Sequence, residues 1–164
     1  MRTINNPFSQ HTGYHCVGCD PQHPSGLKLR FYETGEGLVA RWLPDPGFQG
    51  YPDILHGGIQ ATLLDEIASW LVYVKLETSG VTQKMEVQYL KPVRISHGYI
   101  YLNAILKERG DREAVIEAAI RNGEGETCAR ALLTYFIYPK EIAVKRMNYP
   151  GAEVFRGAEV SDFE

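Results

Sequence analysis

The residues best suited to chemistry lie in one short segment, Leu55 to Asp65, with the sequence LHGGIQATLLD. It begins with a His-Gly-Gly triplet (His56, Gly57 and Gly58), and Asp65 follows eight residues after the first glycine. Glycines at a helix start let a ligand approach backbone N–H groups that lack an intrahelical partner and carry the positive end of the helix dipole. The segment therefore combines a predicted anion-binding helix start with a candidate base.

One long helix is predicted from Gly57 to about Glu77, because its apolar side chains fill a broad arc and Gly80 follows as a stop signal. On a helical wheel, small residues surround Asp65, whereas Glu66 lies about 100° away, where an ordinary solvated glutamate is expected. Asp65 is therefore the preferred catalytic candidate. The alternative is a structural role, as a buried acid paired with a cation or as a polar residue at a dimer seam.

The distance between the two chemical features of this helix predicts an assembly. At about 1.5 Å per residue, Gly57 and Asp65 are roughly 12 Å apart along the axis. A general base and an oxyanion donor must both lie about 3 Å from one reacting carbonyl or its attacking water. Two antiparallel copies of the helix satisfy this, with Gly57 of one opposite Asp65 of the other. We therefore expect a homodimer with two composite sites.

Strand candidates flank the helix, two before it and four after it. They are residues 27–33, 37–43, 81–90, 98–107, 113–121 and 127–138, separated by glycine, proline and other turn residues. The order β-β-α-β-β-β-β predicts an α+β hot-dog fold, an antiparallel sheet wrapped around one long central helix, with the last four strands forming a meander. Residues 1–26 are predicted to be an N-terminal loop or cap, 27–138 the hot-dog domain, and 139–164 a polar C-terminal extension.

Length and charge limit the classes of partner. A chain of 164 residues is enough for one domain with a sizeable core. Its net charge of −3 offers no general attraction to nucleic acid or to an anionic membrane. No signal peptide and no apolar run long enough to cross a bilayer is visible, so the sequence predicts a cytoplasmic protein without nucleic-acid or membrane partners.

Two of the three cysteines, Cys16 and Cys19, form a C-x-x-C pair. Such a pair can be part of a zinc site or a redox pair. Against this, no second C-x-x-C exists, and His11 and His15 lack zinc-finger spacing. We therefore expect a reduced pair in a loop and no metal site, and Cys128 is expected to be a small core residue.

With these elements in place, LHGGIQATLLD and the strand order resemble the hot-dog acyl-CoA thioesterases, and most closely their PaaI-like branch. The resemblance covers roughly residues 25–138 and implies hydrolysis of a thioester to a free acid and CoA. The backbone N–H of Gly57 would polarise the carbonyl, and Asp65 of the partner subunit would act as general base or nucleophile. Thr82 matches a position where related enzymes keep a Ser or Thr near the attacking water. No cofactor is implied, because CoA is part of the substrate.

One position departs from the pattern of these relatives. Some of them have an Asn six residues before the histidine, where this chain has Gly50. Gln49 is the candidate that would hold the water or the carbonyl instead. His56 and Gly58, which flank Gly57, are expected to contact the substrate.

The phosphates of CoA require local cations. Lys91 and Arg94 flank one turn, and Arg109 and Arg112 surround another, so these four residues are candidate phosphate contacts. Hairpin tips also carry such charges for solubility. Aromatic residues near the expected pocket are either acyl-group contacts or core: Phe48, Tyr51, Trp70 and Tyr73.

Two other functions remain open at this point. The first is a non-catalytic acyl-CoA-binding protein with the same fold, since fold does not fix function. The second is an acyl-thioester hydratase or dehydratase, although the sequence lacks the catalytic-histidine loop pattern of those enzymes. The assembly is expected to be a homodimer or a dimer of dimers (homotetramer).

Overall fold

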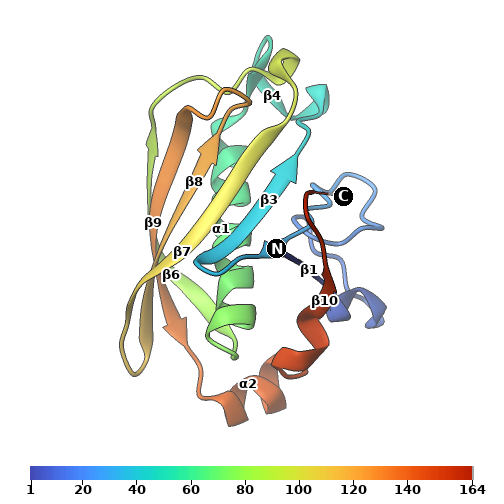
Figure 1. The fold of residues 1–164 in the computed structure, drawn as a ribbon, viewed down its shortest axis with the longest axis vertical. Helices are drawn as coiled ribbons and strands as arrows, with labels where there is room; N and C mark the ends of the chain where they lie inside the picture. The colour runs from blue at the N-terminus through green and yellow to red at the C-terminus, as the bar shows by residue number, and fades with distance from the viewer. Residues whose placement is uncertain (164) are drawn as a thin grey trace.

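The computed structural model describes residues 1–163, which form a large sheet with a long helix against it and a separate two-stranded sheet (Figure 1). Its strands are β1 (Arg2–Ile4), β2 (Tyr32–Glu33), β3 (Gly37–Trp42), β4 (Gln49–Tyr51), β5 (Ile54–Leu55), β6 (Gly80–Tyr89), β7 (Ile100–Arg109), β8 (Glu113–Arg121), β9 (Thr127–Ile137) and β10 (Arg156–Glu159). Its helices are α1 (Gly57–Lys75) and α2 (Lys140–Met147), with short 3-10 turns η1 (Pro7–Gln10), η2 (Pro46–Phe48), η3 (Ile95–His97) and η4 (Ala152–Phe155).

The predicted α+β hot-dog fold is confirmed. Eight strands form one antiparallel sheet in the order β10-β1-β2-β3-β7-β8-β9-β6, and α1 lies along one face of it (Figure 1). The helix starts at Gly57 as expected and ends at Lys75. It stops before Gly80, because Glu77 takes a left-handed conformation with φ of 53°.

The core lies between α1 and the sheet. Leu63, Leu64, Ile67 and Leu71 are completely buried on the helix. The strands meet them with alternate residues: β7 and β8, for example, bury every second residue over much of their length. This period-2 burial is what one-sided packing of a sheet requires. Cys128 is buried in β9, as the sequence predicted.

The expected meander of the last four strands is wrong in one respect. β7, β8 and β9 follow one another in the sheet, but β6 pairs with β9 and forms the free edge of the sheet. Residues 90–99, which include η3, carry the chain from β6 across to β7, beside β3. This connection is longer than a hairpin turn, so β6 need not pair with the next strand in sequence.

The first predicted strand, residues 27–33, is also shorter than expected, because only Tyr32 and Glu33 join the sheet. The backbone N–H groups of Leu27 and Leu29 instead bond to carbonyl groups of the N-terminal loop, at Val17 and Gly18. This pairing fixes the C-x-x-C turn against the body of the domain.

The two ends of the chain lie side by side, since β1 pairs with β10 at one edge of the sheet (Figure 1). Aromatic side chains from both terminal segments pack on α1 in a cluster of Phe8, Trp70, Tyr73, Tyr149 and Phe155. Trp70 and Tyr73 are therefore packing residues. Within residues 1–163, no helix is both long and apolar enough to span a membrane.

Candidate functional site

The start of α1 presents a backbone N–H group, as the sequence predicted. His56 is the N-cap residue, and its Nδ1 accepts a hydrogen bond from the N–H of Gly58 at 2.9 Å. The N–H of Gly57 has no acceptor among residues 1–163, and the Gly57 carbonyl accepts from the hydroxyl of Tyr89 at 2.8 Å. His56 and Gly58 thus cap the helix together, and Gly57 keeps its donor available.

Asp65 is held by two hydroxyl groups. Thr82, on β6, donates to Oδ1 of Asp65 at 2.7 Å, and Tyr135, on β9, lies 2.8 Å from the same oxygen. The Tyr135 hydroxyl also lies 3.0 Å from the Asp65 carbonyl oxygen, so its one proton is shared between the two acceptors. Both donors meet Oδ1, and Oδ2 has no protein donor in the described part of the chain. The arrangement orients one carboxylate oxygen and leaves the other for a substrate or a water molecule.

Sequence reasoning missed Tyr135. Its side chain is 1% exposed, and burial, together with the charge of Asp65, raises the pKa of the phenol well above its usual range. The hydroxyl therefore stays protonated and acts as a donor to the carboxylate. A tyrosine at an inward position of a strand normally reads as core, and only the packing of β9 against α1 brings it to Asp65.

Gln49 does not point to Asp65. Its Oε1 accepts a hydrogen bond from the backbone N–H of Asp53 at 3.3 Å, within the β4–β5 turn. Gly50, the position of the missing Asn, does lie beside the helix start, because a Cβ built there would be 3.3 Å from the His56 ring. Position 50 therefore lies beside the helix start, and a side chain there would crowd the His56 ring.

The first pair of candidate phosphate contacts lies near the start of α1 but is already engaged in ion pairs. Lys91 pairs with Glu126, and Arg94 pairs with Asp53 at 3.3 Å. All four side chains are at least a third exposed, so these pairs are weak and can exchange for a phosphate.

The second pair, Arg109 and Arg112, lies at the opposite end of the sheet, at the β7–β8 turn. β7 has ten residues, so at about 3.3 Å per residue the two turns are roughly 30 Å apart. One chain therefore cannot bring all four cations to a single CoA molecule.

The other two aromatic candidates named from the sequence, Tyr51 and Phe48, lie outside the aromatic cluster on α1. Tyr51 is 79% exposed in β4, and Phe48 packs against Trp42.

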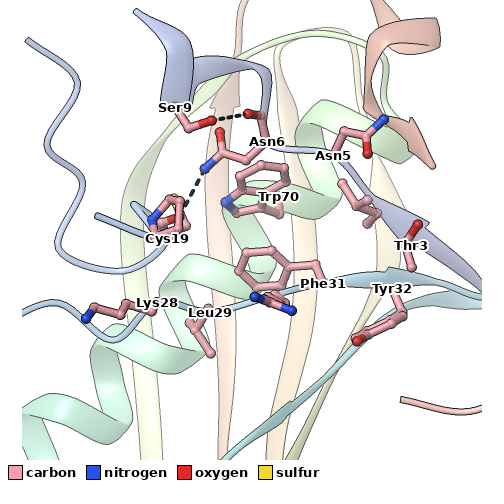
Figure 2. A pocket seen from close by; sticks show the side chains of 13 residues that line it. Thr3, Asn5, Asn6, Ser9, Cys19, Lys28, Leu29, Phe31, Tyr32 and Trp70 are labelled. Carbon is pink, nitrogen blue, oxygen red and sulfur yellow. Dashed lines mark hydrogen bonds between the residues drawn. The ribbon is translucent and has the colours of Figure 1, made fainter. Parts of the chain in front are cut away.

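A partly open pocket of about 370 Å³ lies away from Asp65 (Figure 2). It is lined by the N-terminal segment, by residues 28–32 and by Trp70 of α1, and Cys19 forms part of its wall. Apart from Trp70, which the sequence offered as an acyl-group contact or a core residue, none of the candidate site residues lines it. Asp65 is instead on α1, where it contacts Thr82 on the exposed edge strand β6.

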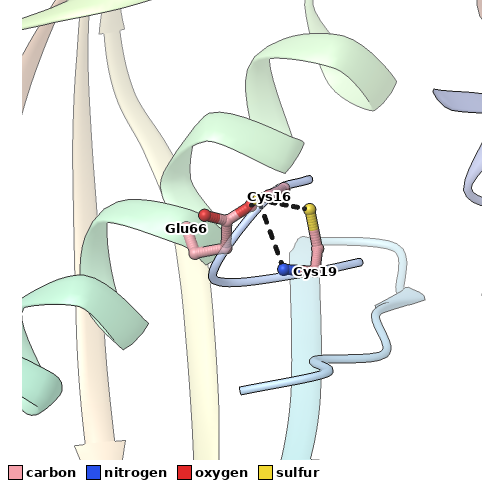
Figure 3. A group of neighbouring side chains, drawn as sticks. All are labelled: Cys16, Cys19 and Glu66. Carbon is pink, nitrogen blue, oxygen red and sulfur yellow. Dashed lines mark hydrogen bonds between the residues drawn. The ribbon is translucent and has the colours of Figure 1, made fainter. Parts of the chain in front are cut away.

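The C-x-x-C pair meets a third acidic side chain, Glu66 (Figure 3). The Sγ atoms of Cys16 and Cys19 are 3.0 Å apart, and Glu66 Oε1 lies 3.5 Å from Cys16 Sγ and 3.2 Å from Trp70 Nε1. The expectation that Glu66 is an ordinary solvated residue is therefore wrong, because the N-terminal loop covers it. Burial raises the pKa of Glu66 to about 7, and the hydrogen bond from Cys19 lowers the pKa of Cys16 to about 5.

A comparison with protein families matches residues 53–129, which contain α1, Asp65 and Thr82, to the model described as "Thioesterase superfamily". The matched segment, slightly less than half of the chain, is similar to the thioesterase superfamily. This agrees with the resemblance drawn from LHGGIQATLLD, at the level of the superfamily.

The matching relatives and solved structures have low sequence identity to this chain. An uncharacterized protein of Schizosaccharomyces pombe is 28% identical over 67% of this chain, and the match spans 65% of that protein. A Bacillus halodurans protein solved with CoA is 29% identical, with a TM-score of 0.56, over 60% of this chain and 70% of that one. A Streptococcus pneumoniae structure described as a hypothetical thioesterase with coenzyme A has a TM-score of 0.63 at 24% identity, over 68% of this chain and 90% of that one, and so shares the fold.

Proposed function

We propose that this protein hydrolyses acyl-CoA thioesters in a site shared by two chains. The observation that carries the proposal is the setting of Asp65, whose Oδ1 is held by Thr82 and Tyr135 while Oδ2 has no donor among residues 1–163. In the proposed reaction, Asp65 acts as a general base on water or attacks the carbonyl itself. The N–H of Gly57 from the partner subunit stabilises the oxyanion.

The surface around Asp65 supports a site completed by a second copy. Gly58, Ala61, Thr62, Asp65 and Ser69 form a stripe along α1 that is not fully buried. The stripe consists mainly of small residues, so another helix can approach it closely. It runs from the helix start to Asp65, which is the span that an antiparallel partner needs in order to place its own Gly57 there.

β6 provides a second part of this surface. It has a neighbour on one side only, and its ten residues leave a free row of backbone hydrogen-bonding groups. Val81, Tyr89 and Leu90, in or next to this strand, are between 41% and 52% exposed. An unpaired edge of this length, with these apolar side chains exposed beside it, is a surface that a second copy of the chain would cover together with α1.

CoA as the thiol part of the substrate is inferred from the superfamily and from the CoA in the Bacillus halodurans structure. Lys91 and Arg94 are the phosphate contacts that we favour, because they lie at the same end of the domain as Gly57 and their acidic partners are exposed. The exposed acids would be displaced by the phosphate groups.

The test is release of free thiol from a panel of acyl-, aryl- and hydroxyacyl-CoA esters. Asp65→Asn keeps the shape of the side chain and removes its basicity, so we expect a loss of about 100- to 10,000-fold in kcat. Asp111→Asn is the matched control, because Asp111 is exposed at the β7–β8 turn, and it should leave the rate unchanged.

Three outcomes would reject the proposal. Turnover by Asp65→Asn at the wild-type rate would exclude the carboxylate from the chemistry. Tight binding of CoA esters by the wild type without hydrolysis of any panel member would indicate a non-catalytic acyl-CoA-binding protein instead. Conversion of enoyl- to hydroxyacyl-CoA without thiol release would indicate a hydratase.

A further inference from the structure

We propose that Cys16, Cys19 and Glu66 bind a zinc ion that fastens the N-terminal segment to α1. Each residue offers one ligand atom, and the three atoms all lie within 4.8 Å of one another (Figure 3). Two thiolates and a carboxylate are a donor set that zinc accepts, and three protein ligands leave a fourth position for water. The proposal is independent of the thioesterase reaction, in which none of the three residues takes part.

The ligands come from two distant parts of the chain. Cys16 lies 50 residues before Glu66, in the N-terminal loop, and Glu66 belongs to the central helix. The sequence shows the cysteine pair but offers no cue to the third ligand. The third ligand joins the pair only in the folded chain, because the N-terminal loop packs on the face of α1 that carries Glu66.

The site is built before any ion binds. Trp70, which is 2% exposed, donates its indole N–H to Glu66 and fixes the carboxylate. The backbone N–H of Cys19 donates to Cys16 Sγ at 3.3 Å, as N–H groups do in tight turns that present a metal-bound thiolate. Gly18 makes room for the acid, because a Cβ at this position would lie only 2.3 Å from Glu66 Oε2.

The two thiols could form a disulfide instead of binding zinc. The distance between their sulfur atoms does not by itself distinguish a disulfide from a zinc site. A Cys16–Cys19 disulfide requires the sulfur atoms to close from 3.0 Å to about 2.05 Å. Tetrahedral zinc, with Zn–S bonds of about 2.3 Å, requires them to open to about 3.8 Å.

Glu66 decides the choice in favour of zinc. A disulfide would remove the Cys16 thiol as a donor and leave this half-buried carboxylate with the Trp70 indole as its described partner. Zinc instead places a cation among three acidic groups, and the thiol protons pass to solvent when it binds.

The experiment measures zinc in the purified full-length protein. The wild type is incubated with zinc under reducing conditions, dialysed into metal-free buffer and analysed by inductively coupled plasma mass spectrometry. We expect roughly one zinc per chain, with none retained by Cys16→Ser or Cys19→Ser. Glu66→Gln should bind zinc more than about 10-fold more weakly. Cys128→Ser is the matched control, because Cys128 is buried in β9 away from the cluster, and it should retain the metal.

A second measurement on the wild type does not depend on the folding of any variant. Cobalt loaded into the site should show a thiolate-to-cobalt charge-transfer band, and a chelator should lower the melting temperature of the zinc-loaded protein. The proposal is overturned if the wild type retains no zinc and shows no such band. It also fails if Cys16→Ser retains as much zinc as the wild type, or if the protein purified under reducing conditions still contains a Cys16–Cys19 disulfide.

Discussion

Replacing Gly57 by proline tests the composite site at a single backbone atom. Gly57 is the first residue of α1, a position where proline gives up no intrahelical hydrogen bond. His56 has φ of −57° and ψ of 133°, the extended conformation that a residue before proline adopts. A Cβ at position 57 would meet the Tyr89 ring at 3.5 Å, an ordinary contact. Gly57→Pro should therefore fold with an unchanged melting temperature.

The expected effect on the reaction follows from the loss of one N–H donor. Removal of one donor from an oxyanion hole typically lowers kcat by about 100- to 1,000-fold, or roughly 2.7–4 kcal/mol. Gly57→Ala is the control, because it adds a Cβ and keeps the N–H. If alanine lowers the rate as much as proline does, the glycine matters for space and not for its donor.

Mixing Gly57→Pro with Asp65→Asn then locates the two groups. In a heterodimer with composite sites, one site carries both substitutions and the other carries neither. Random exchange places half of the chains in heterodimers, so about a quarter of all sites become wild-type. Thiol release by the mixture should therefore recover to about 25% of the wild-type rate. Native mass spectrometry of differently tagged chains verifies the exchange. A verified mixture that stays as inactive as its parents would refute the two-chain site.

Two further predictions concern a hydroxyl donor to Asp65 and the packing of the C-terminal segment. Tyr135→Phe removes one of the two hydroxyl donors to Asp65, and should lower kcat about 10-fold with KM little changed, since about 1.4 kcal/mol corresponds to a factor of 10. An unchanged kcat would assign the hydroxyl to stability alone. Phe155→Ala removes a ring that is 1% exposed and that packs on Trp70 and Tyr73; urea denaturation should show a loss of about 3–5 kcal/mol, and a loss below about 1 kcal/mol would contradict the tight packing of the C-terminal segment.

Local patterns predicted the central helix and most of the sheet. The apolar arc of α1 and the alternation in β7, β8 and β9 are properties of neighbouring residues, so they are visible in sequence. The position of β6 is not, because it depends on where residues 90–99 carry the chain. β1 and β10, with three and four residues, are too short to show a period.

Only the part of the candidate site that lies within one local segment was predicted from the sequence. Asp65 and Gly57 lie on one helix, and their spacing can be measured in sequence. Tyr135 reaches Asp65 only through the packing of β9, and Glu66 meets Cys16 only after the N-terminal loop has folded onto α1. A helical wheel cannot show a contact with a segment 50 residues away.

The pairing of β1 with β10 has a consequence for the order of folding. Arg2 lies opposite Glu159, 157 residues further along the chain, whereas β7, β8 and β9 are joined by short turns. Closing a short loop loses less chain entropy than closing one of this length. We therefore expect the three-stranded meander to form early in folding, and the β1–β10 edge to close only after the rest of the sheet is in place.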